Sequence, residues 1–230
     1  GRLTGRLVRN LGAIKLSEAP QPVEPDAAAQ ATMIAAVRKY GLQILPWTKS
    51  TKALRSRLAW LHAVFGAPWP EMGGVALLAD LESWLEPFLA GQTGLASLAE
   101  GGLENALLNR VPQELQRDID RLAPTHFIAP TGSKLPLQYS EDGTSPVLSI
   151  RVQELFGLNT HPAIAKGTIP LNLELLSPAQ RPIQITLDLP AFWKGSWADV
   201  RAEMRGRYPR HEWPADPAQA APTRRAKPRK

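Results

Sequence analysis

The pattern of apolar and polar positions divides the chain into a helical part and a part rich in short strands. From residue 26 onward, apolar side chains recur three to four residues apart, which is the spacing of a helix that buries one face. After residue 124, short apolar runs alternate with Gly, Pro, Ser and Asp, a pattern typical of strands joined by turns. The sequence therefore predicts an α+β fold, in which a helical bundle module precedes a small β-rich unit with a C-terminal helix and a basic tail.

Five helices are expected in the first part. The first begins after Asp26, a residue suited to an N-cap, and ends at Gly41, and the second covers residues 50–65. The other three are expected at residues 75–88, 103–109 and 112–122, the last of them with Pro112 in its first turn. The apolar faces of the first three helices are expected to contain Met33, Ile34, Val37 and Tyr40, then Leu54, Leu58, Leu61 and Phe65, then Leu78, Leu81, Leu85 and Phe88.

The second part predicts five strands and one short helix. The helix is expected at residues 153–158, between the third and fourth strands, and this order of elements is that of an OB-type barrel. Element order does not decide whether such a sheet closes, so the prediction is a small β-rich unit of OB-like order. The strands are expected at residues 125–129, 134–139, 147–152, 169–176 and 182–189.

The two ends of the chain have a different character. Residues 2–16 alternate like the last strands of a sheet that began earlier, and residues 18–26 contain three prolines typical of an extended linker. A last helix is expected from Ser196 to Gly206, with Asp199 completing a capping box. The expected organisation is thus a remnant of an accessory β domain with its linker (1–25), a helical module (26–123), a β-rich domain (124–213) and a flexible basic tail (214–230).

The formal charge of +6 is concentrated at the end of the chain. Residues 191–230 contain ten Lys or Arg and four acids, whereas residues 1–190 contain seventeen of each sign. Residues 27–70 have six basic side chains and no acid, and residues 71–120 have nine acids and two arginines. This asymmetry favours basic surfaces that could meet a polyanion, although unbalanced helices can also serve only to keep a protein in solution.

Several kinds of chemistry have no residues to support them in this sequence. There is no cysteine, which excludes disulfides and thiolate sites, and no phosphate-binding GxxxxGK loop. The four histidines are isolated from one another, and no serine has the GxSxG context of a nucleophile. No window approaches the length of a membrane span. We therefore expect a cytoplasmic monomer with no catalytic residue, metal site or cofactor of its own.

Residues 192–213 interleave aromatic and basic side chains. Arginine can pair with phosphate and an exposed ring can stack on a base, so this segment could hold a single nucleic-acid strand. Tryptophans near a helix start are more often buried, and Trp197 is expected in the core, which makes the basic residues the better candidates. A second basic segment covers residues 45–60, where the alternative is a solvated helix face. The candidate strand-binding residues are Lys194, Arg201, Arg205, Arg207 and Arg210, followed by Lys49, Lys52 and Arg55.

Several stretches of the sequence resemble the C-terminal region of HrpB-type ATP-dependent helicases, relatives of the DEAH-box RNA helicases. The resemblance runs almost from end to end, and its most distinctive block covers residues 173–214, with an unusual mixture of Trp, Arg and Pro. The matching stretches are LGAIKLSE, GLQILPWTKSTKALRSRLAWL, LAPTHFIAPTGSKLPLQYS, VQELFGL, LELLSPAQRPIQITLDLPAFWKGSWADVRAEMRGRYPRHEWP and PTRRAKP.

The resemblance implies a longer protein with two RecA-type ATPase domains, which bind ATP and Mg²⁺, followed by accessory domains that include an OB-like one. This chain has no counterparts of the family's catalytic residues, so we expect it neither to hydrolyse ATP nor to unwind a duplex. The leading hypothesis is an accessory region that contacts single-stranded RNA or DNA beside the motor. The alternative is a docking platform for the helicase core of the same polypeptide or for a protein partner, with the acidic residues 71–120 in the contact.

Overall fold

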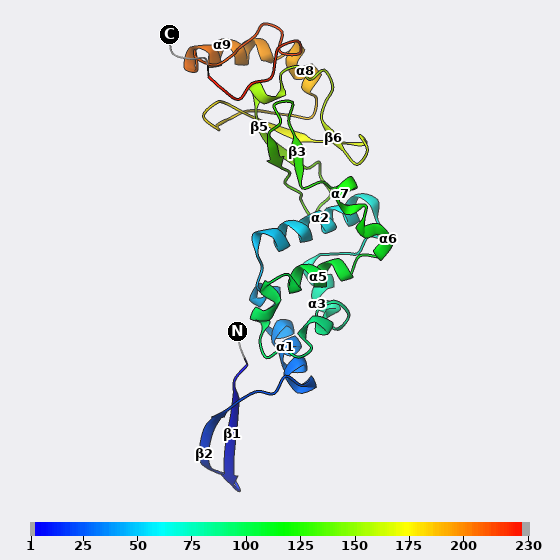
Figure 1. Ribbon diagram of the computed structural model, residues 1–230, viewed down its shortest axis with the longest axis vertical. Helices are drawn as coiled ribbons and strands as arrows, with labels where there is room; N and C mark the ends of the chain where they lie inside the picture. The colour runs from blue at the N-terminus through cyan, green and yellow to red at the C-terminus, as the bar shows by residue number, and fades with distance from the viewer. Residues whose placement is uncertain (1–2, 227–230) are drawn as a thin grey trace. The chain divides into compact units, whose positions relative to one another are not determined.

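The chain divides into two compact units, Gly1–Gln116 and Arg117–Lys230. The computed structural model describes residues 3–226. The first unit consists of a β-hairpin followed by helices, and the second of small sheets followed by two helices (Figure 1). This mixture of helices and small sheets confirms the predicted α+β class.

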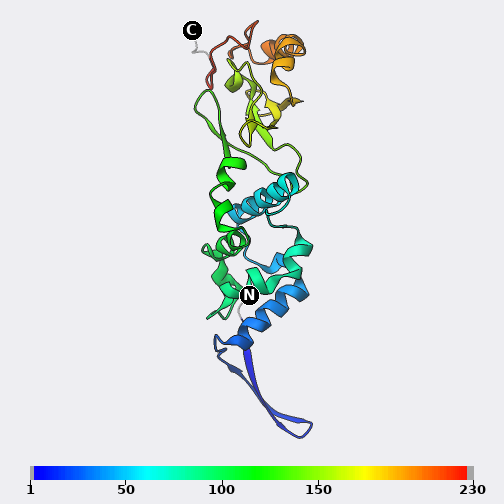
Figure 2. The ribbon, with the colours of Figure 1, turned by 90° about the vertical axis from the view of Figure 1, so that its right-hand side faces the viewer.

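The hairpin of the first unit joins β1 (Gly5–Leu11) to β2 (Ile14–Gln21) in antiparallel register, with Gly12 at the turn in a left-handed conformation. Figure 2 shows this hairpin as a long ribbon that extends away from α1. The second strand continues through Pro20, which pairs with Arg6, into the segment expected as a linker. Apolar side chains on the hairpin are exposed, namely Leu7, Val8, Leu11, Ile14 and Leu16.

The first two helices begin and end close to where their sequences predict. In α1 (Ala27–Tyr40), the Asp26 carboxylate accepts a hydrogen bond from the Ala29 N–H at 2.9 Å, and Gly41 closes the helix at a φ of 83°. In α2 (Lys49–Phe65), Thr48 and Thr51 form a reciprocal capping box, so the helix starts one residue earlier than expected. The predicted apolar faces hold except at their ends, because Tyr40 and Phe65 are exposed.

The predicted helix at residues 75–88 is wrong, because this stretch forms three short pieces. They are α3 (Gly74–Ala79), α4 (Leu81–Trp84) and the 3-10 turn η2 (Glu86–Leu89). Asp80 has a non-helical backbone, with φ −129° and ψ 36°, and Pro87 has no N–H to continue a helical ladder. Leu81 and Leu85 are nevertheless buried as expected.

The rest of the first unit packs around large buried side chains. A 3-10 turn, η3 (Leu95–Ala99), leads to α5 (Gly102–Asn109), which matches its prediction. The expected helix at residues 112–122 is instead two single turns, α6 (Gln113–Gln116) and α7 (Ile119–Leu122), the second of which belongs to the C-terminal unit. Trp60 and Trp84 are fully buried with Leu58, Leu77 and Leu103. A further 3-10 turn, η1 (Leu42–Ile44), connects α1 to α2.

The strands of the second unit form separate small sheets in the part of the chain that the structure describes, and not one closed OB-type barrel. The largest is three-stranded, with β8 in the centre, parallel to β5 and antiparallel to β9. Two-stranded antiparallel pairs lie beside it in sequence. The strands are β3 (His126–Ile128), β4 (Lys134–Pro136), β5 (Val147–Arg151), β6 (Ala163–Ile164), β7 (Ile169–Pro170), β8 (Asn172–Leu176) and β9 (Pro182–Thr186).

Three local predictions in this unit differ from the structure. The expected helix at residues 153–158 is a single 3-10 turn, η4 (Val152–Leu155). The expected strand at residues 169–176 is divided into β7 and β8, and the last strand ends at Thr186 because α8 (Leu189–Lys194) follows, capped by Asp188. The parallel pairing of β5 with β8 requires a crossover, which the intervening η4, β6 and β7 supply.

The last helix, α9 (Trp197–Arg207), is followed by an ordered segment without helix or strand at residues 208–226, which we call the strap. The predicted Ser196 capping box is wrong, because the Ser196 hydroxyl instead hydrogen-bonds Gln184 and caps no helix N–H. The strap folds back onto the unit through backbone hydrogen bonds, Gly157 N–H to Pro217 O at 2.9 Å and Thr223 N–H to Gln153 O at 3.0 Å.

Residues 214–226 were expected to be a flexible tail, and the structure differs because these strap contacts hold them. The sequence pattern could not show the contacts, since they join backbone groups about seventy residues apart. The predicted basic residues Lys227, Arg229 and Lys230 lie outside the described residues.

Candidate nucleic-acid interface

The aromatic side chains of residues 192–213 form a buried cluster that positions the basic residues around it. The Trp197 ring lies 5.4 Å from Trp193 and 5.6 Å from Phe156, in edge-to-face arrangements. Phe192 and Trp213 complete the cluster. All five rings are buried, Trp197 as expected, so none of them offers a face for a nucleic-acid base. The cluster instead anchors α8, α9 and the strap to one another.

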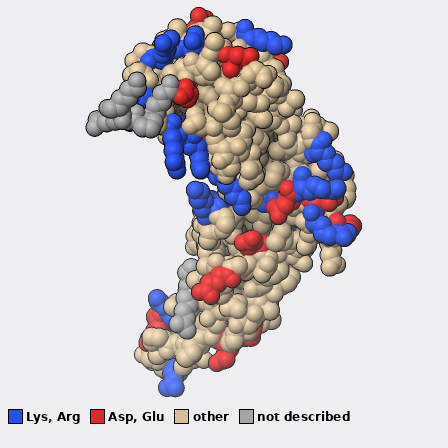
Figure 3. Space-filling model, turned by 45° about the horizontal axis from the view of Figure 1, so that its top comes forward, with Lys and Arg blue, Asp and Glu red and all other residues tan. Residues whose placement is uncertain are grey.

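Four of the five candidate basic residues around α8 and α9 lie on the surface. Lys194, Arg205, Arg207 and Arg210 are exposed, and Arg207 forms an ion pair of 3.0 Å with Glu203 one turn earlier. Arg201 differs, since it is half-buried and its Nε donates to the Trp213 carbonyl at 2.9 Å. Arg201 therefore fastens the strap to α9. In Figure 3, Lys and Arg side chains gather at the end of the molecule that carries α8 and α9, with some acidic side chains among them.

The second basic segment offers fewer free charges than its sequence suggests. Lys49 and Lys52 are exposed in the first turn of α2, where the helix dipole also favours anions. Arg55 is half-buried, its Nε donates to the Met72 carbonyl at 2.9 Å, and its guanidinium lies 5.9 Å from the centre of the Trp47 ring. Arg57 is buried. Two of the four basic residues in this helix thus stabilise the N-terminal unit itself.

The predicted binding residues therefore belong to two sets, one in each unit. Lys194, Arg205, Arg207 and Arg210 lie in the C-terminal unit, and Lys49 and Lys52 lie in the N-terminal unit. Each unit presents its own basic residues, and each set can be tested separately.

Glu154 forms the most elaborate polar network of the C-terminal unit. Its carboxylate is buried and accepts hydrogen bonds from Thr131 at 2.7 Å, from Ser133, and from Arg151 Nη2 at 2.9 Å and Nε at 3.1 Å. Burial raises the pKa of Glu154, but the hydrogen bonds from Ser133, Thr131 and Arg151 outweigh it and hold the pKa below its ordinary value. The network joins η4 to the turn between β3 and β4.

This network predicts an acid-sensitive C-terminal unit. Because the folded-state pKa of Glu154 is depressed, its stabilisation is complete above the unfolded value of 4.5 and is lost as the pH falls through the folded pKa. The Glu154→Gln variant should lose about 1 to 3 kcal/mol at neutral pH and become less dependent on pH below 4.5. Urea unfolding at several pH values measures both effects. The matched control is Glu100→Gln, an exposed carboxylate, and equal curves for the two variants would contradict the prediction.

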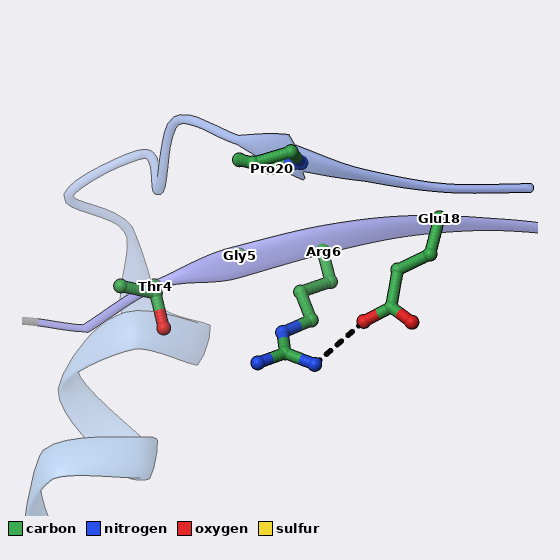
Figure 4. Close-up of a pocket in the computed structure, with 5 residues that line it drawn as sticks. All are labelled: Thr4, Gly5, Arg6, Glu18 and Pro20. Atoms are coloured by element: carbon green, nitrogen blue, oxygen red, sulfur yellow. Dashed lines mark hydrogen bonds and ion pairs between the residues drawn. The ribbon is translucent and has the colours of Figure 1, made fainter.

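The remaining features of the surface do not form a catalytic or metal centre. In residues 3–226, no three or more His, Cys, Asp or Glu side chains are placed to hold a metal ion. No helix within that range is both long enough and apolar enough for a membrane crossing. A shallow pocket on the hairpin is lined by Thr4, Gly5, Arg6, Glu18 and Pro20, and its charged wall is the Arg6–Glu18 ion pair of 2.6 Å (Figure 4). These side chains neutralise each other and offer no reactive group.

Sequence reasoning missed Arg151 and His211. The Nη1 of Arg151 lies 3.5 Å from the carbonyl oxygen of Arg224 in the strap. Burial lowers the pKa of His211, and the positive charges of Arg151 and Arg210 lower it further. No local pattern could reveal this group, because it assembles from the end of β5 and from two separate parts of the strap.

Comparisons with known proteins agree with this description. A family model described as "ATP-dependent helicase C-terminal" matches residues 84–217, which is more than half of the chain. The ATP-dependent RNA helicase HrpB of Escherichia coli (strain K12) is 44% identical over 218 residues, which cover 93% of this chain and 26% of that protein. The chain thus spans about a quarter of the length of this curated relative.

Two solved structures are also similar. A crystal structure of the E. coli DExH-box NTPase HrpB superposes with a TM-score of 0.80 at 38% identity, covering 97% of this chain and 30% of that one. A crystal structure of the Escherichia coli DEAH/RHA helicase HrpB has a TM-score of 0.67 at 37% identity, covering 92% of this chain and 29% of that one.

Proposed function

The chain belongs to the family of HrpB-type ATP-dependent helicase C-terminal regions, and from this premise we propose that it contacts single-stranded RNA beside a helicase core. The core of the whole protein would bind ATP and Mg²⁺ and move the strand, and this region would hold the strand without catalysing a reaction. The similarity to the E. coli ATP-dependent RNA helicase supports RNA ahead of DNA as the substrate. The proposed protein acts as a monomer in the cytoplasm.

One observation carries the proposal: exposed basic side chains surround α9. Lys194, Arg205, Arg207 and Arg210 are all accessible to a ligand, and the C-terminal unit has 16 Lys and Arg against 11 Asp and Glu. Because the aromatic rings of this region are buried, binding would rest on phosphate contacts and not on base stacking. Such binding is weakly selective for sequence and strongly dependent on salt.

The test is a fluorescence-anisotropy titration of the 230-residue chain with a short labelled single-stranded RNA at two salt concentrations. The variant K194E/R205E/R207E/R210E should bind about 100-fold more weakly at low salt, because each phosphate contact contributes roughly 0.7 to the salt slope of a single strand. Arg201 is left unchanged because its hydrogen bond to Trp213 holds the strap. A parallel variant, K49E/K52E, measures the contribution of α2.

The matched control is R117E/K134E/K166E/R181E, which changes the charge of the same unit by the same amount at four other exposed positions. If the two quadruple variants weaken binding equally, only the net charge matters and no binding surface lies around α9. If the unmodified chain fails to bind RNA at low salt, the proposal is wrong.

A docking platform is the second candidate, and the hairpin favours it. Two-stranded hairpins are marginal in isolation, and this one exposes apolar residues that a protein partner could cover, with Leu11, Ile14 and Leu16 each more than 60% exposed. The acidic residues 71–120 offer less, since Asp80 pairs with Arg110 and Glu82 with Arg38. Binding to the separated ATPase core, reduced by polar substitution of Leu11 and Ile14, would support this function.

A further inference from the structure

The strap holds its basic residues against the start of η4. The Thr223 N–H donates to the Gln153 carbonyl, and the Arg224 carbonyl receives Arg151 Nη1, so the backbone of the strap runs directly beside residues 151–153. Thr223 also caps the next turn, since its Oγ1 accepts from the Arg225 N–H at 3.2 Å. The exposed side chains of Arg224 and Arg225 are therefore carried on a fixed backbone and not on a loose chain end.

The first part of the strap brings further cationic groups to Arg151. Arg210 and His211 follow directly after α9, and the His211 N–H donates to the Tyr208 carbonyl at 3.0 Å, which fixes the turn. The Tyr208 ring lies edge-on to His211 at 6.3 Å. The electrostatic effect of both Arg151 and Arg210 on His211 agrees with three groups gathered at one place.

The guanidinium of Arg151 is held in place before any ligand arrives. Its Nε and Nη2 donate to the buried Glu154 carboxylate, and its Nη1 faces the strap, while a quarter of its side chain stays exposed. A cation fixed in this way loses little conformational freedom when an anion binds. The acidic groups close by in sequence are Glu154, which is fully engaged with Arg151, Thr131 and Ser133, and Glu212, which follows His211 on the exposed side of the strap.

We propose that Arg151, Arg210 and His211 bind one phosphodiester group of a single strand, and that Arg224 and Arg225 contact the next phosphate along it. This inference rests on the proposed function and names a site within it. The fork of a guanidinium matches two phosphate oxygens, and a protonated imidazole donates a further charge-assisted hydrogen bond. The site differs from the α9 surface because it exists only while the strap is seated.

Proton uptake by His211 gives this site a specific signature. In the free chain, the neighbouring cations disfavour the charged imidazole. A bound phosphate supplies negative charge next to the ring and favours the protonated form. The pKa of His211 is therefore expected to rise when RNA binds, whereas a strand bound elsewhere would leave it unchanged.

The experiment combines a histidine titration by NMR with an anisotropy titration. The His211 resonance of the full chain is assigned with His211→Gln and followed against pH with and without a short single-stranded RNA at low salt. The variant R224E/R225E should bind the RNA at least tenfold more weakly, because Arg151 contacts the Arg224 carbonyl and not its side chain, so the strap keeps its seat. The matched control R117E/K134E should bind like the unmodified chain.

The outcomes separate the inference from the function on which it rests. RNA binding with a raised His211 pKa and a weakened R224E/R225E variant supports the site. RNA binding in which either the pKa of His211 or the affinity of R224E/R225E stays unchanged overturns the site and leaves the proposed function standing. Absence of RNA binding at low salt overturns both. Circular dichroism of R224E/R225E shows whether the variant is folded, and H211Q, which keeps the arginines, provides a second affinity measurement at the same site.

Discussion

Replacing Trp197 with Ala is expected to destabilise the C-terminal unit by about 3 to 5 kcal/mol, the usual range for a fully buried tryptophan. Trp197 is 1% exposed, and its ring contacts those of Phe156, Phe192, Trp193 and Trp213. Its Nε1 also donates to the Pro214 carbonyl at 3.0 Å, so the variant loses a connection to the strap as well as the packing. Amide hydrogen exchange in β8 measures the free energy of opening directly in this unit.

Trp197→Phe is the matched control for this prediction. It keeps an aromatic ring in the cluster and removes the N–H that donates to Pro214, so its cost should be about 1 to 3 kcal/mol. A Trp197→Ala variant that loses less than about 1 kcal/mol would show that the cluster can close around the cavity, contrary to the close packing expected of such a core.

Replacing Trp84 with Ala is expected to have an effect of similar size on the N-terminal unit. Trp84 ends the short helix α4, is fully buried, and donates its Nε1–H to the Leu77 carbonyl at 3.0 Å. Helices of four to six residues have almost no stability of their own, so α3 and α4 depend on this packing. A loss of about 3 to 5 kcal/mol is expected, measured from hydrogen exchange of the α2 amides.

Two further variants test the physical reason for this effect. Trp84→Phe should restore most of the buried area but leave the Leu77 carbonyl without its donor. Trp47→Phe removes the N–H of a half-buried tryptophan, which donates to the Leu42 carbonyl at 2.7 Å, and should cost less than Trp84→Ala. If the stability of Trp84→Ala equals that of Trp47→Phe, the short helices do not depend on the buried ring.

Local signals predicted the fold best where a helix is stabilised by its own caps. Asp26 and Gly41 bound α1 as expected, because the capping hydrogen bonds lie within four residues. The stretch at residues 75–88 has a helical apolar period, yet Asp80 and Pro87 interrupt it, since tertiary packing of Leu81 and Trp84 can be satisfied by short pieces. Parallel pairing of β5 with β8 joins residues about twenty-five apart and leaves no signature in either strand.

The candidate site shows the same limit. Residue type and spacing identified the exposed Lys194, Arg205, Arg207 and Arg210, but could not distinguish them from Arg201, whose side chain is committed to a backbone carbonyl. Arg151 has no distinctive sequence context at all. Its importance arises from the strap, whose contacts join parts of the chain that only the folded structure brings together.

The strap also sets an order of events during synthesis. Its hydrogen bonds from Thr223 to Gln153 and from Gly157 to Pro217 join residues that leave the ribosome some sixty to seventy codons apart. Contacts of such separation form slowly, because a long loop must close before they are made. Until residue 223 has emerged, the groove beside η4 is uncovered and the phosphate site that we propose is incomplete. A nascent chain of this region would therefore acquire its affinity for a strand at the end of translation, when premature capture of RNA near the ribosome is no longer a hazard to its own folding.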